Sequence, residues 1–285
     1  MNASAPFGEQ IEELARALYD RPTNQTSVSR EDLYSKLNHL TQSEIDDLLH
    51  QFFLAGLLGF SPNGGTIRLN SLGKRTYELG SSAERVLGPT YVRSKYSGAV
   101  MHLVVTKPNG DEAGATGFFL DREGLLVTAR HVVDENRVVR LEDTNQSVVS
   151  QNVSILWMGE EPLDLALLRS DASTRHRPFR FIEQIPYEPL EKVLIFGYPP
   201  YAGHGIALHV STGEILSVPN QLTGGRQSLI ISNAVAPGCS GGPVVNSAGI
   251  PIGVIAQENQ LHGSGQATGF LSATPIRYLK ESGLV

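Results

Sequence analysis

The chain has 285 residues, of which 40% are hydrophobic, 18% charged and 7% aromatic. This composition is sufficient for a sizeable core and excludes a largely disordered or collagen-like chain. The formal net charge of −6 argues against a general binder of nucleic acids or anionic membranes, because neutralising phosphate requires a surplus of Lys and Arg. The 29 glycines and 16 prolines indicate many turns, as in an all-β protein.

The N-terminal residues and the cysteine count bear on the cellular compartment. Residues 1–10 lack the basic and apolar regions of a secretory signal peptide, and no apolar run approaches the roughly 20 residues that cross a bilayer. The single cysteine, Cys239, excludes an intramolecular disulfide and slightly favours a reducing compartment. We therefore expect a cytoplasmic protein that does not contact membranes.

The first ~90 residues carry apolar side chains at helical spacing. Ser29 and Thr41 are predicted N-caps of a second and a third helix, with Asp32 and Glu44 three residues further on. The apolar face predicted for the third helix comprises Ile45, Leu48, Leu49, Phe52 and Phe53. A turn, a short strand over 66–69 and a last helix near 72–79 follow. This order resembles a winged helix-turn-helix over residues 8–82.

Charge disfavours DNA binding by this region. Residues 1–90 contain 8 Lys and Arg against 11 Asp and Glu. Glu44, Asp46 and Asp47 lie near the start of the helix that would enter the groove, where carboxylates repel phosphate and also cap the helix. The basic residues available to a wing are Arg68, Lys74 and Arg75. Binding of a protein partner or self-association is therefore favoured over DNA binding, and a plain packing module is the third alternative.

From about Tyr96 the pattern changes to short apolar runs separated by turn residues, which is typical of a sandwich or barrel. About ten strands over ~190 residues would suit two small barrels, joined by the Pro-rich stretch 178–189. We therefore predict a multidomain α plus all-β chain. Its parts are a winged-helix-like domain over 1–88, a linker over 89–97, and a β domain over 98–285 with barrels at about 98–185 and 190–280.

Three segments of the β region carry residues suited to nucleophilic catalysis. They are 126–133 with His131, 162–168 with Asp164, and 237–243 with Ser240. Acyl transfer requires a hydroxyl, a base to accept its proton and a carboxylate to fix the tautomer of the base. Each residue alone is more often structural, but the three together in one β region favour catalysis.

Glycines surround Ser240 and allow a tight turn in which backbone N–H groups converge. The N–H groups of Gly238 and Ser240 are the predicted oxyanion hole. One such donor is worth about 3–4 kcal/mol in the transition state.

These segments resemble the chymotrypsin-like serine peptidases, and most of all the bacterial HtrA/Deg-type branch, over residues ~97–280. The resemblance is carried by Gly114-Ala115-Thr116-Gly117-Phe118-Phe119-Leu120, Val127-Thr128-Ala129-Arg130-His131-Val132, Asp164-Leu165-Ala166-Leu167-Leu168, Phe196-Gly197-Tyr198-Pro199 and Ala234-Val235-Ala236-Pro237-Gly238-Cys239-Ser240-Gly241-Gly242-Pro243. It implies a double β-barrel, with His131 and Asp164 from the first barrel and Ser240 from the second.

The resemblance also implies a substrate site. Ala256, Gln257 and Glu258 correspond to the strand edge that pairs with the substrate backbone. Ala234, Val235 and Ala236 correspond to one wall of the specificity pocket, with Gly269 or Phe270 near the opposite side. Because no acid occupies that wall, we expect cleavage after a small or medium aliphatic residue and not after Arg or Lys.

The chain departs from the family at Cys239, where this branch usually has Asn and digestive peptidases have Asp. Activation by a freed N-terminus has no ionic partner without that Asp. A second departure is the N-terminal region, which the common members lack. The histidines outside the candidate triad form no cluster with metal-ligand spacing, and no phosphate-binding glycine loop is present, so we expect no metal and no cofactor.

The leading hypothesis is a serine endopeptidase that is localised or gated by its N-terminal module, in a setting such as bacterial stress response or defence. The alternative is a DNA-binding or partner-binding regulator that uses a dormant or self-cleaving peptidase fold as a sensor. Self-cleavage would fall near residues 80–90. In both cases the substrate is a protein or peptide.

Overall fold

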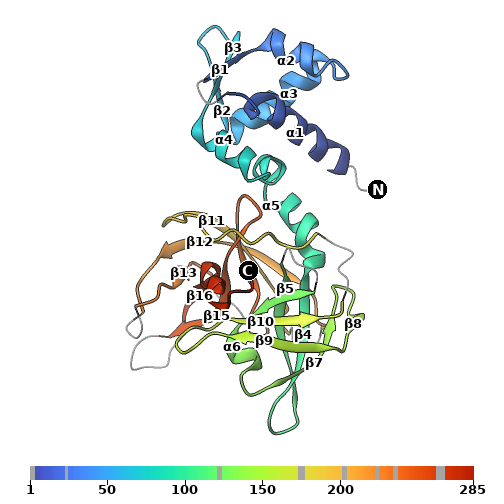
Figure 1. Ribbon diagram of the computed structural model, residues 1–285, viewed down its shortest axis with the longest axis vertical. Coiled ribbons are helices and arrows are strands. Elements are labelled where there is room, and N and C mark those ends of the chain that lie inside the picture. The colour runs from blue at the N-terminus through green and yellow to red at the C-terminus, as the bar shows by residue number, and fades with distance from the viewer. Residues whose placement is uncertain are drawn as a thin grey trace. The chain divides into compact units, whose positions relative to one another are not determined.

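The computed structural model describes residues 4–22, 25–120, 124–172, 177–200, 204–221, 225–233, 237–260 and 267–285. Contacts divide the chain into two compact parts, Met1–Val92 and Arg93–Val285, here called unit 1 and unit 2 (Figure 1). Helix α5 (Ser82–Tyr96) crosses this boundary and is interrupted at Gly88, where φ is 72°, just before Pro89. Residues 89–97, expected as a linker, therefore lie in the second part of α5 and at the start of a short 3-10 turn (Ser97–Ala99).

Unit 1 consists of helices and a small antiparallel sheet with strand order β1-β3-β2. Its elements before α5 are α1 (Ser4–Tyr19), β1 (Ser27–Ser29), α2 (Arg30–Lys36), α3 (Gln42–Leu54), β2 (Leu58–Phe60), β3 (Thr66–Leu69) and α4 (Ser71–Glu78). The predicted strand over 66–69 is confirmed. The strands β1 and β2 were not anticipated, because three residues are too few to show an alternating pattern.

The two predicted N-caps of unit 1 are confirmed. The Ser29 hydroxyl accepts a hydrogen bond from the N–H of Asp32, and Thr41 forms a complete capping box with Glu44. The predicted apolar face of α3 is buried except at Phe53, which is 46% exposed. Phe53 follows Phe52 by about 100° around the helix and therefore leaves the buried face. Its ring lies 5.4 Å from that of Phe60 instead.

Unit 2 contains a seven-stranded sheet followed by a closed barrel, so the predicted second barrel is confirmed, whereas the strands of the predicted first barrel form an open sheet. The sheet has the order β8-β7-β4-β5-β6-β10-β9, and the barrel runs β11-β12-β13-β16-β15-β14. The strands of the sheet are β4 (Val100–Thr106), β5 (Glu112–Phe119), β6 (Leu125–Thr128), β7 (Arg137–Glu142), β8 (Val148–Ser150), β9 (Val153–Met158) and β10 (Ala166–Ser170). Those of the barrel are β11 (Lys192–Gly197), β12 (His209–Ser217), β13 (Leu229–Ile231), β14 (Pro243–Asn246), β15 (Pro251–Gln260) and β16 (Ala267–Pro275). The chain closes with a 3-10 segment (Ile276–Ser282).

The seven-stranded sheet curls because its two edge strands are neighbours in sequence. Strands β8 and β9 lie at opposite edges, and only Gln151 and Asn152 separate them. The curl is fixed by Asp171, which follows β10 and accepts hydrogen bonds from the Ser150 hydroxyl at 2.5 Å and from the Asn152 amide at 2.6 Å. The contacts of Asp171 therefore bring the end of β10 to the turn between β8 and β9, although the sheet itself is open.

Phe179 joins the two β structures at the start of the Pro-rich crossover. This side chain is fully buried. Its ring lies 5.6 Å from Phe118 of β5, 6.0 Å from Phe196 of β11 and 4.7 Å from Tyr96, measured between centroids. Edge-to-face and stacked aromatic contacts of this kind add to the energy of burial. They place the end of β5 against the start of the second barrel.

A charged network braces β4, β5 and β7. His102 is 3% exposed, and its Nδ1 lies 2.9 Å from Oε2 of Glu142. Arg140 donates to Glu142 at 2.7 Å and to Glu112 at 2.9 and 3.2 Å. Burial opposes ionisation of Glu142, but the hydrogen bonds from Arg140 and His102 outweigh it and hold the pKa of that carboxyl below its ordinary value.

Replacing Thr41 by Ala removes the side-chain cap of α3, and we expect this to destabilise the first turn of the helix by about 1 kcal/mol. Amide hydrogen exchange of α3 in the full chain measures the effect and should become faster in Thr41→Ala. Ser43→Ala is the matched control, because Ser43 is exposed in the same turn. Equal exchange in the two variants would show that the capping box contributes nothing.

Replacing Glu142 by Gln should lower the free energy of unfolding at pH 7 by about 1–3 kcal/mol, because hydrogen bonds to a charged group are lost. A carboxyl whose folded pKa is lowered stabilises the fold above its unfolded pKa of about 4.3 and loses this effect as pH falls through the folded pKa. The difference from wild type should therefore shrink below pH 4.

Urea denaturation at pH 7 and pH 3.5 measures this difference. Glu112→Gln is the control, because Glu112 also pairs with Arg140 but its side chain is 53% exposed and its pair is worth less. A loss for Glu142→Gln that is the same at both pH values would contradict the electrostatic explanation.

Candidate active site

His131 and Asp164 are brought together by the pairing of β6 with β10. Ala166 lies opposite Thr128 in this antiparallel pair, so the residues before Ala166 lie opposite those after Thr128. At that point the chain leaves β6 and makes the helical turn α6 (Arg130–Val133), which carries His131. Register alone therefore places the carboxylate of Asp164 beside the imidazole.

Both carboxylate oxygens of Asp164 contact His131. Oδ2 lies 2.8 Å from Nδ1, and Oδ1 accepts the backbone N–H of His131 at 2.9 Å. A carboxylate at Nδ1 favours the tautomer with hydrogen on that atom, which leaves Nε2 as a proton acceptor. The His131 side chain is 49% exposed, and that of Asp164 is 24% exposed. The pair is thus an oriented base that is accessible to a reacting molecule.

The predicted nucleophile, Ser240, lies in the loop between β13 and β14, here called the nucleophile loop (residues 237–242). Its carbonyl accepts the N–H of Thr116 on β5 at 2.9 Å. A Cβ added to Gly241 would collide with Thr116 O and Thr128 Oγ1 and would lie 3.0 Å from the N atom of Ala129. The loop of the second barrel is therefore packed against the strand end that leads to His131.

The Ser240 hydroxyl is directed at the carbonyl oxygen of Ala256, at 3.4 Å. The hydrogen bonds found among the described residues do not join it to His131. Ser240 is half-buried, so its side chain has room to change rotamer.

The predicted oxyanion donors lie in a backbone that requires glycine. Gly238 has φ of 94°, and a Cβ there would lie 2.5 Å from the carbonyl oxygen of Tyr198. Two later N–H groups of the loop already donate hydrogen bonds to backbone carbonyls, that of Gly241 to Ile255 O and that of Gly242 to Cys239 O. Within the described part of the chain, the N–H groups of Gly238 and Ser240 donate to no backbone carbonyl.

The predicted strand edge for substrate is formed by β15. This strand pairs with β14 as far as Val254 and continues along β16, where Gln257 lies opposite Ser272 and Glu258 opposite Leu271. Past Val254 its other side turns toward the nucleophile loop, as the contact between Ala256 and Ser240 shows. The side chains of Gln257 and Glu258 are outside the described residues.

The predicted specificity pocket is only partly described. Ala234, Val235 and Ala236 lie outside the described residues. Gly269 is exposed on β16 with φ of 73°, and open space surrounds the position of a Cβ. The preference for an aliphatic residue before the cut therefore stays a prediction.

Two buried threonines that support the nucleophile loop were not predicted from the sequence. Thr116 and Thr128 are both fully buried, and the hydroxyl of Thr128 donates to the Thr116 carbonyl at 2.7 Å. Both residues lie inside segments that carry the family resemblance, Thr116 in 114–120 and Thr128 in 127–132. The hydroxyl of Thr116, however, donates to Gly238, which lies 122 residues further along the chain in the nucleophile loop, so the motifs alone did not indicate this contact.

Within the described ranges, no group of His, Cys, Asp and Glu residues has the geometry of a metal site. The helices that the structure describes are all too short or too polar to span a bilayer.

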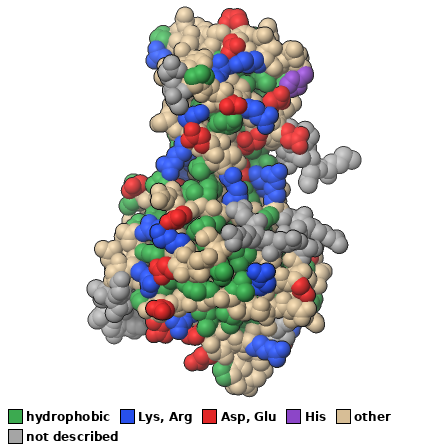
Figure 2. Space-filling view, in the orientation of Figure 1, with side chains coloured by type: hydrophobic (Ala, Val, Ile, Leu, Met, Phe, Trp, Pro, Cys, Tyr) green, Lys and Arg blue, Asp and Glu red, His purple; other side chains and the backbone are tan. Residues whose placement is uncertain are grey.

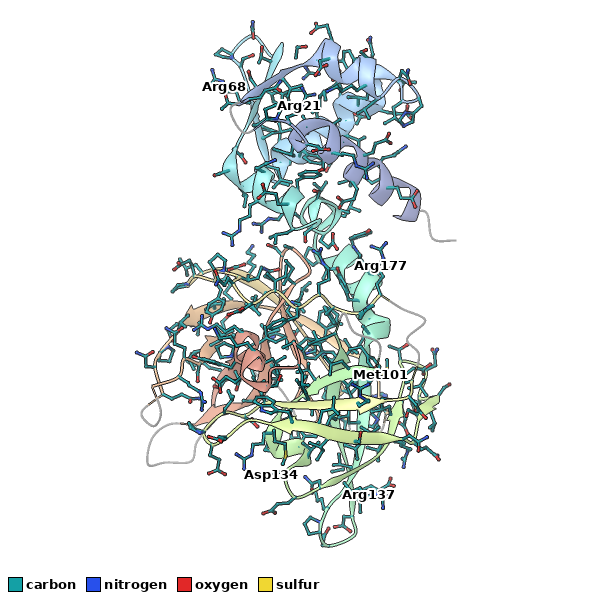
Figure 3. All side chains as sticks on the ribbon, in the orientation of Figure 1. Arg21, Arg68, Met101, Asp134, Arg137 and Arg177 are labelled. Carbon is teal, nitrogen blue, oxygen red and sulfur yellow. The ribbon has the colours of Figure 1, made fainter. Side chains whose placement is uncertain are left out.

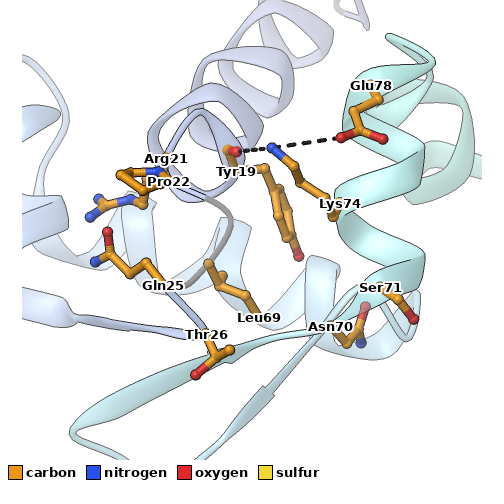
Figure 4. A pocket seen from close by; sticks show the side chains of 10 residues that line it. All are labelled: Tyr19, Arg21, Pro22, Gln25, Thr26, Leu69, Asn70, Ser71, Lys74 and Glu78. Carbon is orange, nitrogen blue, oxygen red and sulfur yellow. Dashed lines mark hydrogen bonds and ion pairs between the residues drawn. The ribbon is translucent and has the colours of Figure 1, made fainter.

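Unit 1 has a hollow of about 280 Å³ between the end of α1, β3 and α4 (Figure 4). Its two cationic side chains are both engaged. Lys74 donates to the carbonyl of Tyr19 at 2.8 Å and lies 3.7 Å from Glu78, and Arg21 donates to Asp32 at 2.7 Å. Lys74, one of the three basic residues predicted to be available to a wing, therefore already has partners within unit 1.

The other two basic residues predicted for a wing, Arg68 and Arg75, are exposed, and Arg68 extends from β3 (Figure 3). The visible face of unit 1 intermixes Lys and Arg with Asp and Glu (Figure 2). The acidic residues of α3 have structural partners. Asp46 accepts from Arg30 and from the Tyr34 hydroxyl, and Glu44 caps the helix.

The β region matches known proteins. Residues 115–254 match the family described as trypsin-like peptidase domain. An uncharacterized protein, y4bJ, of Sinorhizobium fredii is 30% identical over 159 residues, which are 53% of this chain and 24% of that protein. Protease Do-like 1, chloroplastic, of Arabidopsis thaliana is 26% identical over 162 residues, which are 56% of this chain and 36% of that protein.

A solved structure of an HtrA-type protease, AlgW with tripeptide, is 23% identical with a TM-score of 0.55. That match covers 67% of this chain and 61% of the other. The chain spans well under half the length of the two sequence relatives it matches. The family match over residues 115–254 and the fold of the solved structure agree that unit 2 contains a trypsin-like peptidase domain.

Proposed function

We propose that the chain is a serine endopeptidase in which Ser240, His131 and Asp164 form the catalytic triad. The observation that carries this proposal is the double contact between Asp164 and His131, which orients the imidazole and selects its tautomer. The packing of the nucleophile loop against the end of β6 supports it, because that contact brings the segment of Ser240 to the segment of His131.

The proposed reaction begins when the Ser240 hydroxyl turns from Ala256 O toward Nε2 of His131. Oγ attacks the carbonyl carbon of the scissile peptide bond, and Nε2 accepts the hydroxyl proton. Asp164 stabilises the imidazolium that results. The new oxyanion accepts hydrogen bonds from the N–H groups of Gly238 and Ser240. Nε2 then returns the proton to the leaving amine, and water releases the acyl group by the same steps in reverse.

The substrate backbone is proposed to pair with β15 near Ala256 as an added strand. This pairing fits an enzyme that cuts extended segments within a polypeptide. The tripeptide named with the HtrA-type protease AlgW is consistent with peptide binding by this fold. The specificity expected from the sequence, a small or medium aliphatic residue before the cut, belongs to this proposal.

Unit 1 is proposed to be a winged-helix-type module that binds a protein partner or a second copy, and so localises or gates the peptidase in the cytoplasm. The order of α1, α2, α3, β2, β3 and α4 supports the winged-helix assignment. The structural roles of Lys74 and Asp46 count against the alternative of a DNA-binding regulator.

A fluorophosphonate probe should label the wild-type chain at Ser240 and should fail to label Ser240→Ala. Peptidase kcat should fall by about 10⁶-fold in Ser240→Ala and by about 10⁴-fold in Asp164→Asn, which leaves the imidazole in the wrong tautomer. Labelling followed by peptide mapping identifies the modified residue. Ser247→Ala is the control, because it alters a serine outside the nucleophile loop. A wild-type chain that resists the probe even with candidate partners present would refute the triad.

Unit 1 should bind duplex DNA no more tightly than a non-specific acidic protein does. Fluorescence anisotropy of the full chain with labelled duplex, at 50 and 200 mM salt, tests this. Steeply salt-dependent binding that disappears in Arg68→Ala/Arg75→Ala would favour the DNA-binding regulator, because released counterions give affinity a strong salt dependence.

A further inference from the structure

Every polar atom of Thr116 is engaged, and three of its four contacts reach the second barrel. Its N–H donates to Ser240 O at 2.9 Å, and its hydroxyl donates to Gly238 O at 2.7 Å. The same hydroxyl accepts the N–H of Tyr198 at 3.0 Å. Its carbonyl accepts the hydroxyl of Thr128 at 2.7 Å.

Thr116 is free to make these contacts because β6 is short. Strand β5 pairs with β6 only at Phe118 and Phe119, while its other side pairs with β4 from Glu112 to Phe118. At Thr116 the backbone on the β6 side therefore has no strand partner. The nucleophile loop takes that place, and the Ser240 carbonyl occupies the position that a ladder partner would have.

The two carbonyls that Thr116 holds lie on either side of the oxyanion donor. The Gly238 carbonyl belongs to the peptide group before Cys239, and the Ser240 carbonyl to the one before Gly241. Between them lies the peptide group that carries the Ser240 N–H. Fixing the carbonyls on both sides limits rotation of that middle group. Gly238, with φ of 94°, carries the other proposed donor.

Burial raises the energetic cost of losing any of these hydrogen bonds. Thr116 and Thr128 are fully buried, and Tyr198 is 2% exposed. Water therefore does not replace a lost partner, and a backbone group left unpaired there carries its full desolvation cost. Thr128 is the last residue of β6 and precedes His131 by three residues, so the hydrogen bond between Thr128 and Thr116 ties the segment that leads to the base to the residue that holds the nucleophile loop.

We propose that Thr116 is a positioning residue of the active site, whose side-chain hydroxyl holds the nucleophile loop in the shape that directs the N–H groups of Gly238 and Ser240 at the oxyanion. Thr128 fixes Thr116 from the side of the base. This inference rests on the proposed peptidase function, although its structural part can be measured without activity.

The test compares Thr116→Val with Thr116→Ser in the full chain. Valine has nearly the shape of threonine but neither donates to Gly238 O nor accepts from Tyr198 N–H, whereas serine keeps both contacts. We expect Thr116→Val to lower kcat by up to 10²–10³-fold, the loss that follows removal of one oxyanion donor. KM should change little, because the β15 edge is untouched. Thr116→Ser should recover most of the activity.

Affinity for a peptide aldehyde should fall in Thr116→Val in step with kcat/KM, because the aldehyde forms an oxyanion when Ser240 adds to it. Thr76→Val is the matched control. Thr76 is 4% exposed in unit 1, and its hydroxyl donates to Leu72 O at 2.7 Å. The control loses the same kind of bond at a site outside the peptidase domain.

Amide hydrogen exchange of the peptide that covers the nucleophile loop gives a readout without catalysis. Exchange there should be faster in Thr116→Val than in wild type, Thr116→Ser or Thr76→Val. Unchanged exchange together with unchanged kcat would overturn the proposal. If the wild type has no activity, the proposed function fails, and the exchange result alone then decides whether Thr116 holds the loop.

Discussion

The seating of the nucleophile loop on the free edge of β5 is the contact on which the rest of the site depends. Here a backbone hydrogen bond joins the second barrel to the first sheet. The Ser240 carbonyl takes the N–H of Thr116, and Gly241 leaves no room for a side chain against Thr116 and Thr128. A loop displaced from this edge would separate Ser240 from the segment that carries His131, however well Asp164 orients the imidazole.

The two halves of the site are built by different kinds of interaction. Strand register aligns Asp164 with His131 within the first sheet, so their geometry follows from the pairing of β6 with β10. Hydrogen bonds between the first sheet and the barrel position Ser240, the proposed nucleophile, and aromatic packing around Phe179 holds the two β structures in contact.

Much of this arrangement could be predicted from sequence, and the limits have physical causes. Capping at Ser29 and Thr41 is a local interaction within four residues, so it could be read directly and is confirmed. The prediction that Phe53 belongs to the buried face of α3 was wrong, because periodicity alone does not decide which residue at the margin of an apolar face is covered. The contact between His131 and Asp164 was expected from the residue types that acyl transfer requires and from the family resemblance, because the spacing of 33 residues alone would not have indicated it. The contacts of Thr116 depend on where β6 stops pairing with β5, and no local sequence pattern encodes that point.

The direction of the Ser240 hydroxyl links substrate binding to the start of the reaction. Its acceptor, the Ala256 carbonyl, lies on the strand edge where a substrate strand would pair. A backbone carbonyl on an edge strand is the natural acceptor for an N–H of an added strand. At 3.4 Å the serine makes a long hydrogen bond with this oxygen, which a well-aligned peptide N–H would replace with a shorter one. The hydroxyl would then turn to Nε2 of His131, so that pairing of the substrate backbone and formation of the hydrogen bond between Ser240 and His131 would occur together.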